Sequence, residues 1–309
     1  MSWPDSHHEL MQVVERQKAS SGILCSPYFA TLQNSEMSRF TFESTQQQFF
    51  FAVRFFSRAM AALAARIPDS TTRLPLIHNL AEEHGLADDE EGAGDGDIRA
   101  QDSAGHHHPF HPALAHDRTF RTFLERLKVA RKEVVDFGES VREVDAREGE
   151  APAEPTTDAE THGSAGASPS QFENRTRRQP VASPVTGQEP IERPAVRAFN
   201  LALWAACAIE HPSTAFACLG AIEYSFADIS ALIGNCIVDR GWMRRDMLVH
   251  YKLHAEIDKR HAGDFFSVVV NDWADEAVGR HHVESGLSLG FYLFKRLYHD
   301  LLTEATDHD

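Results

Sequence analysis

Helical spacing of apolar residues is the feature that most limits what this chain can fold into. In residues 42–67 the apolar side chains follow the 3.6-residue period of a helix, and residues 68–70 (Pro-Asp-Ser) interrupt it. A second helix is expected over residues 71–84, followed by Gly85, where helices commonly end in the left-handed conformation. The sequence contains no alternating run of β-branched residues with the length of a strand. These patterns predict an all-α protein.

Two stretches break the helical pattern. Residues 86–110 combine Gly, Asp and Glu with a run of three histidines, which is typical of a loop. Residues 136–194 hold seven of the chain's fourteen prolines and few aliphatic residues, which is the composition of a disordered linker. We therefore expect an N-terminal segment (1–26) and one helical bundle, whose two halves (27–135 and 195–306) are joined by this linker.

Net charge and cysteine content indicate which partners and which cellular compartment to expect. The net charge of -16 argues against a nucleic-acid partner, because phosphate binding needs a basic face. The four cysteines form no C-x-x-C pair, so we expect a reducing compartment and no thiolate zinc site. The N-terminus has no apolar leader, and no uninterrupted apolar run of about 18 residues occurs. The expectation is a cytoplasmic protein without a membrane partner.

The most informative polar motif is HAEIDKRH, which spans residues 254–261. Its spacings of four and three residues place His254, Asp258 and His261 on one face of a helix. Two imidazoles and a carboxylate that converge on one ion suit non-haem iron or manganese better than a thiolate metal. The alternative is an exposed, ion-paired face beside Lys259 and Arg260. The motif alone does not decide between these two interpretations.

Carboxylates on other helices would complete such a site. Glu223 lies in the apolar sequence LGAIEYSF, and a buried Glu without a partner is costly, so it should have one. Glu82 and Glu83 end an otherwise apolar helix, although simple exposure at a helix end is the commoner outcome for such a pair.

Several histidines compete for the remaining position. Five fall within a dozen residues: His106, His107, His108, His111 and His116. Of these, only His116 lies inside a clear helical pattern, which would hold a ligand rigidly. His111 precedes Pro112 and is the second choice, since Pro is tolerated in the first turn of a helix. His250 is a further alternative ligand.

Taken in chain order, NLAEEHG, H-x-x-x-F-x-x-F-L-x-x-L, LGAIEYSF and HAEIDKRH resemble the haem-oxygenase-like diiron oxidases and oxygenases, which are relatives of haem oxygenase, TenA and PqqC. The resemblance covers roughly residues 27–135 and 196–304. It implies a haem-oxygenase-like bundle of seven helices that holds two iron ions. The iron ligands that it implies are Glu83, His116, Glu223, His254, Asp258 and His261, with Glu82, His111 and His250 as alternatives.

The resemblance also implies an activity. Members use O2 to oxidise small amino-acid-like or amine metabolites by N-oxygenation, desaturation or oxidative C–C cleavage, in specialised metabolism. The sequence has no dinucleotide-binding fingerprint, so the electrons would come from an external donor or from the substrate, and a homodimer is compatible with the resemblance. Apolar lining of a pocket is expected from Phe49, Phe50, Phe55 and Phe56. The alternatives are a metal-free oxidase of the PqqC and TenA type and a helical binding protein.

Overall fold

The computed structural model describes residues 3–86, 111–127, 191–274 and 276–306. Helices and the turns between them make up these residues, and no strand occurs among them, so the expected all-α fold is confirmed. Most of the predicted acidic loop and of the predicted linker lies outside the described residues. The described residues before and after the gap at 128–190 pack into one compact unit.

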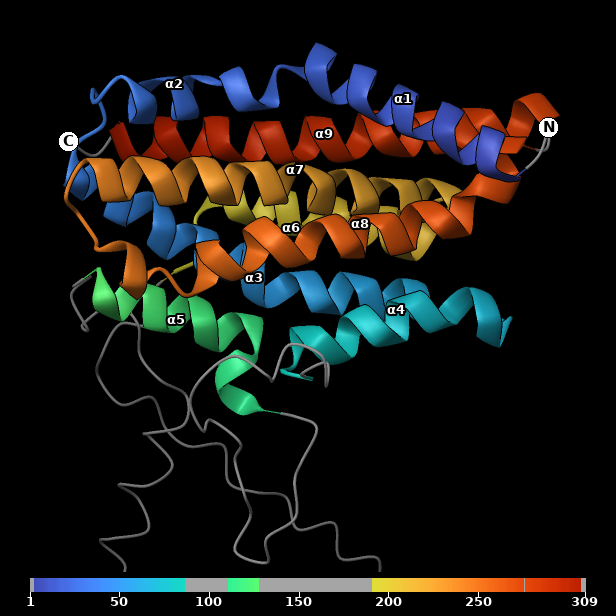
Figure 1. Cartoon of the computed structure of the whole chain (residues 1–309), viewed down its shortest axis with the longest axis horizontal. Coiled ribbons are helices and arrows are strands. Elements are labelled where there is room, and N and C mark those ends of the chain that lie inside the picture. The colour runs from blue at the N-terminus through green and yellow to red at the C-terminus, as the bar shows by residue number, and fades with distance from the viewer. Residues whose placement is uncertain (1–2, 87–110, 128–190, 275, 307–309) are drawn as a thin grey trace, which may run out of the picture. The chain divides into compact units, whose positions relative to one another are not determined.

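The α-helices of the described residues are shown in Figure 1. Their bounds are α1 Trp3–Ser21, α2 Pro27–Gln33, α3 Arg39–Ala64, α4 Ser70–Glu83, α5 His116–Arg126, α6 Pro194–Ile209, α7 Pro212–Asp239, α8 His250–Ala274 and α9 Glu276–Thr306. Capping side chains stabilise the first turn of two of these helices, and one of them, Asp69, lies in the expected break at residues 68–70. Ser38 accepts a hydrogen bond from the backbone N–H of Thr41 at the start of α3, and Asp69 accepts one from Thr72 at the start of α4.

The centre of the bundle is α7, which packs against both α8 and α9 (Figure 1). By length and composition α7 could cross a membrane, but 78% of its most apolar window is buried among the other helices, as in a core helix. The contact with α9 is close. A Cβ atom at Gly286 would lie 2.2 Å from the carbonyl oxygen of Thr214, and one at Gly290 would lie 2.4 Å from that of Cys218.

Helix α1 packs within the bundle, although we predicted residues 1–26 as a separate N-terminal segment. Helix α1 packs against α8 and α9, and it buries Leu10, Val13 and Val14. Its other residues are mostly polar. The apolar stripe is therefore too narrow to stand out in the sequence, and its burial depends on a surface that helices from the far end of the chain provide.

Gly85 joins α4 to the segment that leads into α5. Its φ of 93° is in the left-handed region, as the sequence predicts, and a Cβ atom there would lie 2.3 Å from the carbonyl oxygen of His111. The backbone N–H of His111 also donates a 2.6 Å hydrogen bond to the carbonyl oxygen of Gly85. This joint holds the start of α5 beside the end of α4.

Replacing Gly85 with Ala should lower the free energy of unfolding by roughly 2 to 3 kcal/mol, because it combines a left-handed backbone with a backbone clash. Gly241→Ala is the matched control, since Gly241 has a φ of 67° but no atom within 4 Å of an added Cβ. Its cost should be about 1 kcal/mol. Urea titration of both variants measures the difference, and equal losses would show that contact with His111 does not constrain this turn.

Candidate metal centre

The six residues expected as ligands come from four helices and are all buried. Helix α4 provides Glu83, α5 provides His116 and α7 provides Glu223, while α8 provides the other three. On α8 the spacing of four and three residues places the two imidazoles and the carboxylate on the side that faces the core. The exposed, ion-paired face considered for this motif is therefore wrong.

Short distances connect the carboxylates to the imidazoles. Oε1 of Glu83 lies 2.7 Å from Nδ1 of His116, and Oε1 of Glu223 lies 3.9 Å from Nδ1 of His261. Glu83, Glu223 and His261 each offer one ligand atom, and these three atoms lie within 4.8 Å of one another. Donors from α4, α7 and α8 therefore converge on a space of the size that a metal ion occupies.

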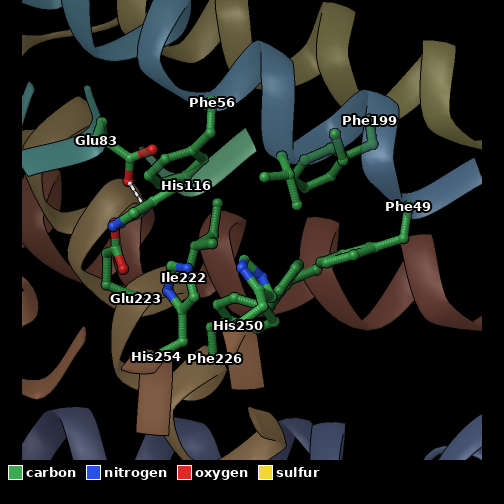
Figure 2. Close-up of a pocket in the computed structure, with 13 residues that line it drawn as sticks. Phe49, Phe56, Glu83, His116, Phe199, Ile222, Glu223, Phe226, His250 and His254 are labelled. Atoms are coloured by element: carbon green, nitrogen blue, oxygen red, sulfur yellow. Dashed lines mark ion pairs between the residues drawn. The ribbon is translucent and has the colours of Figure 1, made fainter. Parts of the chain in front are cut away.

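The other two α8 residues adjoin this group. Oδ1 of Asp258 lies 2.7 Å from Nδ1 of His254, and the ring of His254 lies 4.3 Å from that of His116, measured between centroids. In Figure 2, Glu83, His116, Glu223 and His254 gather at one end of a pocket. The structure thus brings together all six residues that the resemblance implies as ligands.

Burial changes the pKa values of the carboxyl groups. It raises the pKa of Glu223 well above its usual value, and the negative charges of Asp258 and Glu83 act in the same direction. Burial is also the main reason that the pKa of Asp258 rises to about 8. It opposes ionisation of Glu83 as well, but the charge and hydrogen bond of His116 outweigh it and lower this pKa. Without a bound cation, the protein therefore does not favour ionisation of all three carboxyl groups at once.

Unpartnered polar atoms show that the donor set fits a metal ion. Among the described residues, Nε2 of His254, Oδ2 of Asp258 and Nδ1 of His261 are buried without a hydrogen-bond partner. Leaving such atoms unsatisfied costs about 1 to 3 kcal/mol each, so they are rare unless a bound group satisfies them. Imidazole nitrogens and carboxylate oxygens are suitable ligands for iron, and a cation would balance the negative charge.

Comparison with known families agrees with this chemistry. The sequence profile of a family described as iron-containing redox enzymes matches residues 44–291, a range that includes all six residues. The chain belongs to this family. No curated protein matches it. As an iron-containing redox enzyme the chain is an oxidoreductase, and its haem-oxygenase-like helical fold is the one expected from the resemblance.

The three alternative ligands occupy different places in this redox enzyme. Glu82 accepts hydrogen bonds from Nε2 of His261 at 2.7 Å and from Arg260 at 2.6 Å. His111 lies at the turn beside Gly85, outside the group of converging donors. His250 lines the pocket, and its Nδ1 lies 3.1 Å from Oγ1 of Thr119. His106, His107 and His108 lie outside the described residues.

Glu82 holds His261 in one orientation. A hydrogen bond from Nε2 to this carboxylate turns Nδ1, the unpartnered nitrogen, towards Glu223. Burial opposes ionisation of Glu82, but the hydrogen bonds and charges of His261 and Arg260 lower its pKa to about 2. The adjacent residues Glu82 and Glu83 therefore have different roles. Glu82 orients the imidazole of His261, whereas Glu83 is one of the converging donors.

Replacing Glu82 with Gln should weaken iron binding by about 10- to 100-fold, because the uncharged amide has only one acceptor oxygen for the two donors, His261 and Arg260. Metal titration of the metal-free protein measures this change. Glu43→Gln is the matched control, since Glu43 forms an ion pair with Arg39 near the surface, 2.7 Å apart and away from the site. Equal iron affinities for the two variants would show that Glu82 has no part in the metal site.

The pocket beside the donors is mostly apolar. Its apolar lining residues are Phe49, Ala52, Val53, Phe56, Phe199, Ile222, Phe226 and Phe294. Of the four phenylalanines expected there, Phe49 and Phe56 line the pocket, whereas Phe50 and Phe55 are not among its lining residues. Phe50 instead stacks on Phe120, at 5.7 Å between ring centroids. Phe199 and Phe294, from α6 and α9, could not be assigned to the pocket without knowing how the helices pack.

Proposed function

We propose that this iron-containing redox enzyme is a non-haem diiron oxidase or oxygenase that uses O2 to oxidise a small molecule. The observation that carries the proposal is the convergence of buried carboxylates and imidazoles from α4, α5, α7 and α8, with donor atoms that have no partner among the described residues. Carboxylate and histidine ligands from facing helices of a bundle are the usual setting of diiron sites.

The size of the donor set supports two ions rather than one. Three carboxylates and three imidazoles are more than a single ion needs if it is to keep open positions for O2 and substrate. Glu223, on α7, has an oxygen within 4.8 Å of donor atoms from both α4 and α8, and it would be one of the residues that hold the ions. Ferrous ions held there would supply the reducing electrons with which O2 is activated.

The residues around the donors prepare the site for such chemistry. Glu82 orients His261, and the 2.7 Å contact with Asp258 orients His254, so both rings hold a fixed position before any ion binds. The phenylalanines of the pocket exclude water and bind the apolar part of a substrate beside the donors.

The charge of the pocket's lining residues also limits which substrates can bind. No Lys or Arg is among its described lining residues, so a substrate carboxylate would depend on a bound metal ion or on the histidines to balance its charge. A small amine metabolite with an apolar body therefore fits better than a free amino acid. N-oxygenation, desaturation and oxidative C–C cleavage are all compatible with such a substrate. We further propose that an external donor in the cytoplasm restores the ferrous state.

Anaerobic reconstitution with ferrous iron tests this function. The purified chain should retain about two iron ions after removal of excess metal, and it should consume O2 when air is admitted. Replacing His254 with Ala should reduce both quantities. The control is His299→Ala, which removes an exposed histidine of α9. Retention of no iron would instead favour a metal-free oxidase or a helical binding protein, and one iron ion would contradict the diiron assignment.

A further inference from the structure

His250 is a polar residue of the pocket that has no place in the metal site described above. It begins α8 one turn before His254, and its side chain is fully buried. The rings of His250 and His254 are 4.1 Å apart between centroids. No carboxylate contacts His250 among the described hydrogen bonds and ion pairs, unlike the three imidazoles of the donor group.

The contacts of Thr119 indicate which ring nitrogen of His250 carries the proton. Oγ1 of Thr119 donates a 2.9 Å hydrogen bond to the carbonyl oxygen of His116, and a hydroxyl group has only one proton to donate. We assign this proton to the shorter of the two contacts, so Thr119 is the acceptor at its 3.1 Å contact with Nδ1 of His250. It follows that Nδ1 of His250 carries the proton, and that Nε2 of the neutral ring has a free lone pair.

That lone pair has no partner within the described part of the chain. Nε2 of His250 is buried and makes no hydrogen bond there, although the residue lines the pocket. Two of the rings beside it are apolar, with Phe120 at 4.6 Å and Phe226 at 6.0 Å between centroids. A buried acceptor in such surroundings is costly unless the occupant of the pocket provides a donor.

The position of His250 distinguishes it from the donor group. In Figure 2 it lies between His254 and Phe49, towards the apolar end of the pocket and away from Glu83. It is also not one of the residues whose ligand atoms converge within 4.8 Å. A molecule that fills the apolar end and extends towards the donors would pass His250.

We propose that Nε2 of His250 accepts a hydrogen bond from an N–H or O–H group of the substrate. The pocket would then select a small molecule that has an apolar body and one uncharged hydrogen-bond donor beside its reacting part. This inference rests on the proposed function, because it assigns the substrate class of the same site. A site built to accept such a bond discriminates strongly against an analogue that lacks the donor.

Two small probes that differ mainly in a donor test the assignment. Phenol has an O–H group, and fluorobenzene has a similar shape without a donor. Calorimetric titration of the metal-free full chain should show that phenol binds roughly tenfold more tightly, as expected for one hydrogen bond in a dry pocket. His250→Phe keeps an aromatic ring against Phe120 and Phe226 but should bind both probes equally.

Thr119 gives a second, independent pair of variants. Thr119→Val keeps the shape of the side chain but removes the acceptor for Nδ1 of His250, so it should reduce the preference for phenol. Thr119→Ser keeps the hydroxyl and should retain the preference. Nitrogen NMR of the wild-type protein should also show an unprotonated Nε2 in His250, and Thr119→Val should change this signal.

The outcomes separate this inference from the proposed function. A preference for phenol that persists in His250→Phe, or no preference in the wild type, would overturn the role of His250. If His250→Phe loses as much iron as His254→Ala, His250 is a metal ligand, which contradicts this inference but supports a metal site. A chain that prefers phenol but retains no iron would contradict the diiron function alone.

Discussion

His254→Ala and Asp258→Ala should each lower iron affinity by at least 100-fold while the helical content of the protein stays unchanged. Each substitution removes a ligand atom, Nε2 of His254 or Oδ2 of Asp258, that has no hydrogen-bond partner in the described part of the chain. Without metal, each substitution also breaks the 2.7 Å contact between His254 and Asp258, so we expect a moderate loss of stability with the fold retained. With metal, the variants should lose the stabilisation that ligand binding gives to the folded state.

Thermal unfolding with and without ferrous iron, together with iron analysis and circular dichroism, measures both effects. The wild-type protein should unfold at a higher temperature when iron is present, and His299→Ala should behave like the wild type. Unfolding of both variants at a much lower temperature, with unchanged iron content in the folded fraction, would show that the polar stripe of α8 is structural.

Gly290→Ala should destabilise the bundle by roughly 3 kcal/mol, whether or not metal is bound. Its added Cβ would lie 2.4 Å from a carbonyl oxygen of α7 and 2.9 Å from the Cβ of Ala221, so α7 and α9 must move apart. Combining it with Gly286→Ala, one turn earlier, should add little once the helices have separated.

Gly263→Ala is the control for this prediction. Gly263 lies within α8, and an added Cβ there has no atom within 4 Å. Because Ala restricts the unfolded chain more than Gly does, this variant should be more stable by up to about 1 kcal/mol. Urea unfolding of the three variants measures the differences. A loss below about 1 kcal/mol for Gly290→Ala would show that the α7 and α9 contact tolerates a methyl group.

Much of the donor set could be predicted from the sequence because unusual residues interrupt regular patterns. Glu223 is an acid in an otherwise apolar helix, and His254, Asp258 and His261 share a stripe of α8. In both cases the local sequence predicts a polar group that faces the core. A buried polar group needs a polar partner, so these residues are expected to contact polar side chains of helices that are distant in the sequence.

Other parts of the site depend on contacts that no local pattern contains. Glu82 and Glu83 are adjacent and chemically alike, and only the packing of α4 against α8 shows that Glu82 contacts His261 while Glu83 contacts His116. The proton position in His250 depends on Thr119, which is 131 residues away.

The donors of α4 and α5 are separated from those of α8 by more than a hundred residues of sequence, and this separation affects how the site forms during synthesis of the protein. Glu83 and His116 leave the ribosome well before α8, and the 131 residues between Thr119 and His250 take on the order of ten seconds to translate. During this time the nascent chain exposes the faces of α3, α4 and α5 that later pack against α6 and α8, and chaperones could bind them. The metal centre requires α8, so iron can enter only a chain that has been translated through this helix. A product truncated before His254 would lack the three donors of α8, so iron content would report whether this helix has been made.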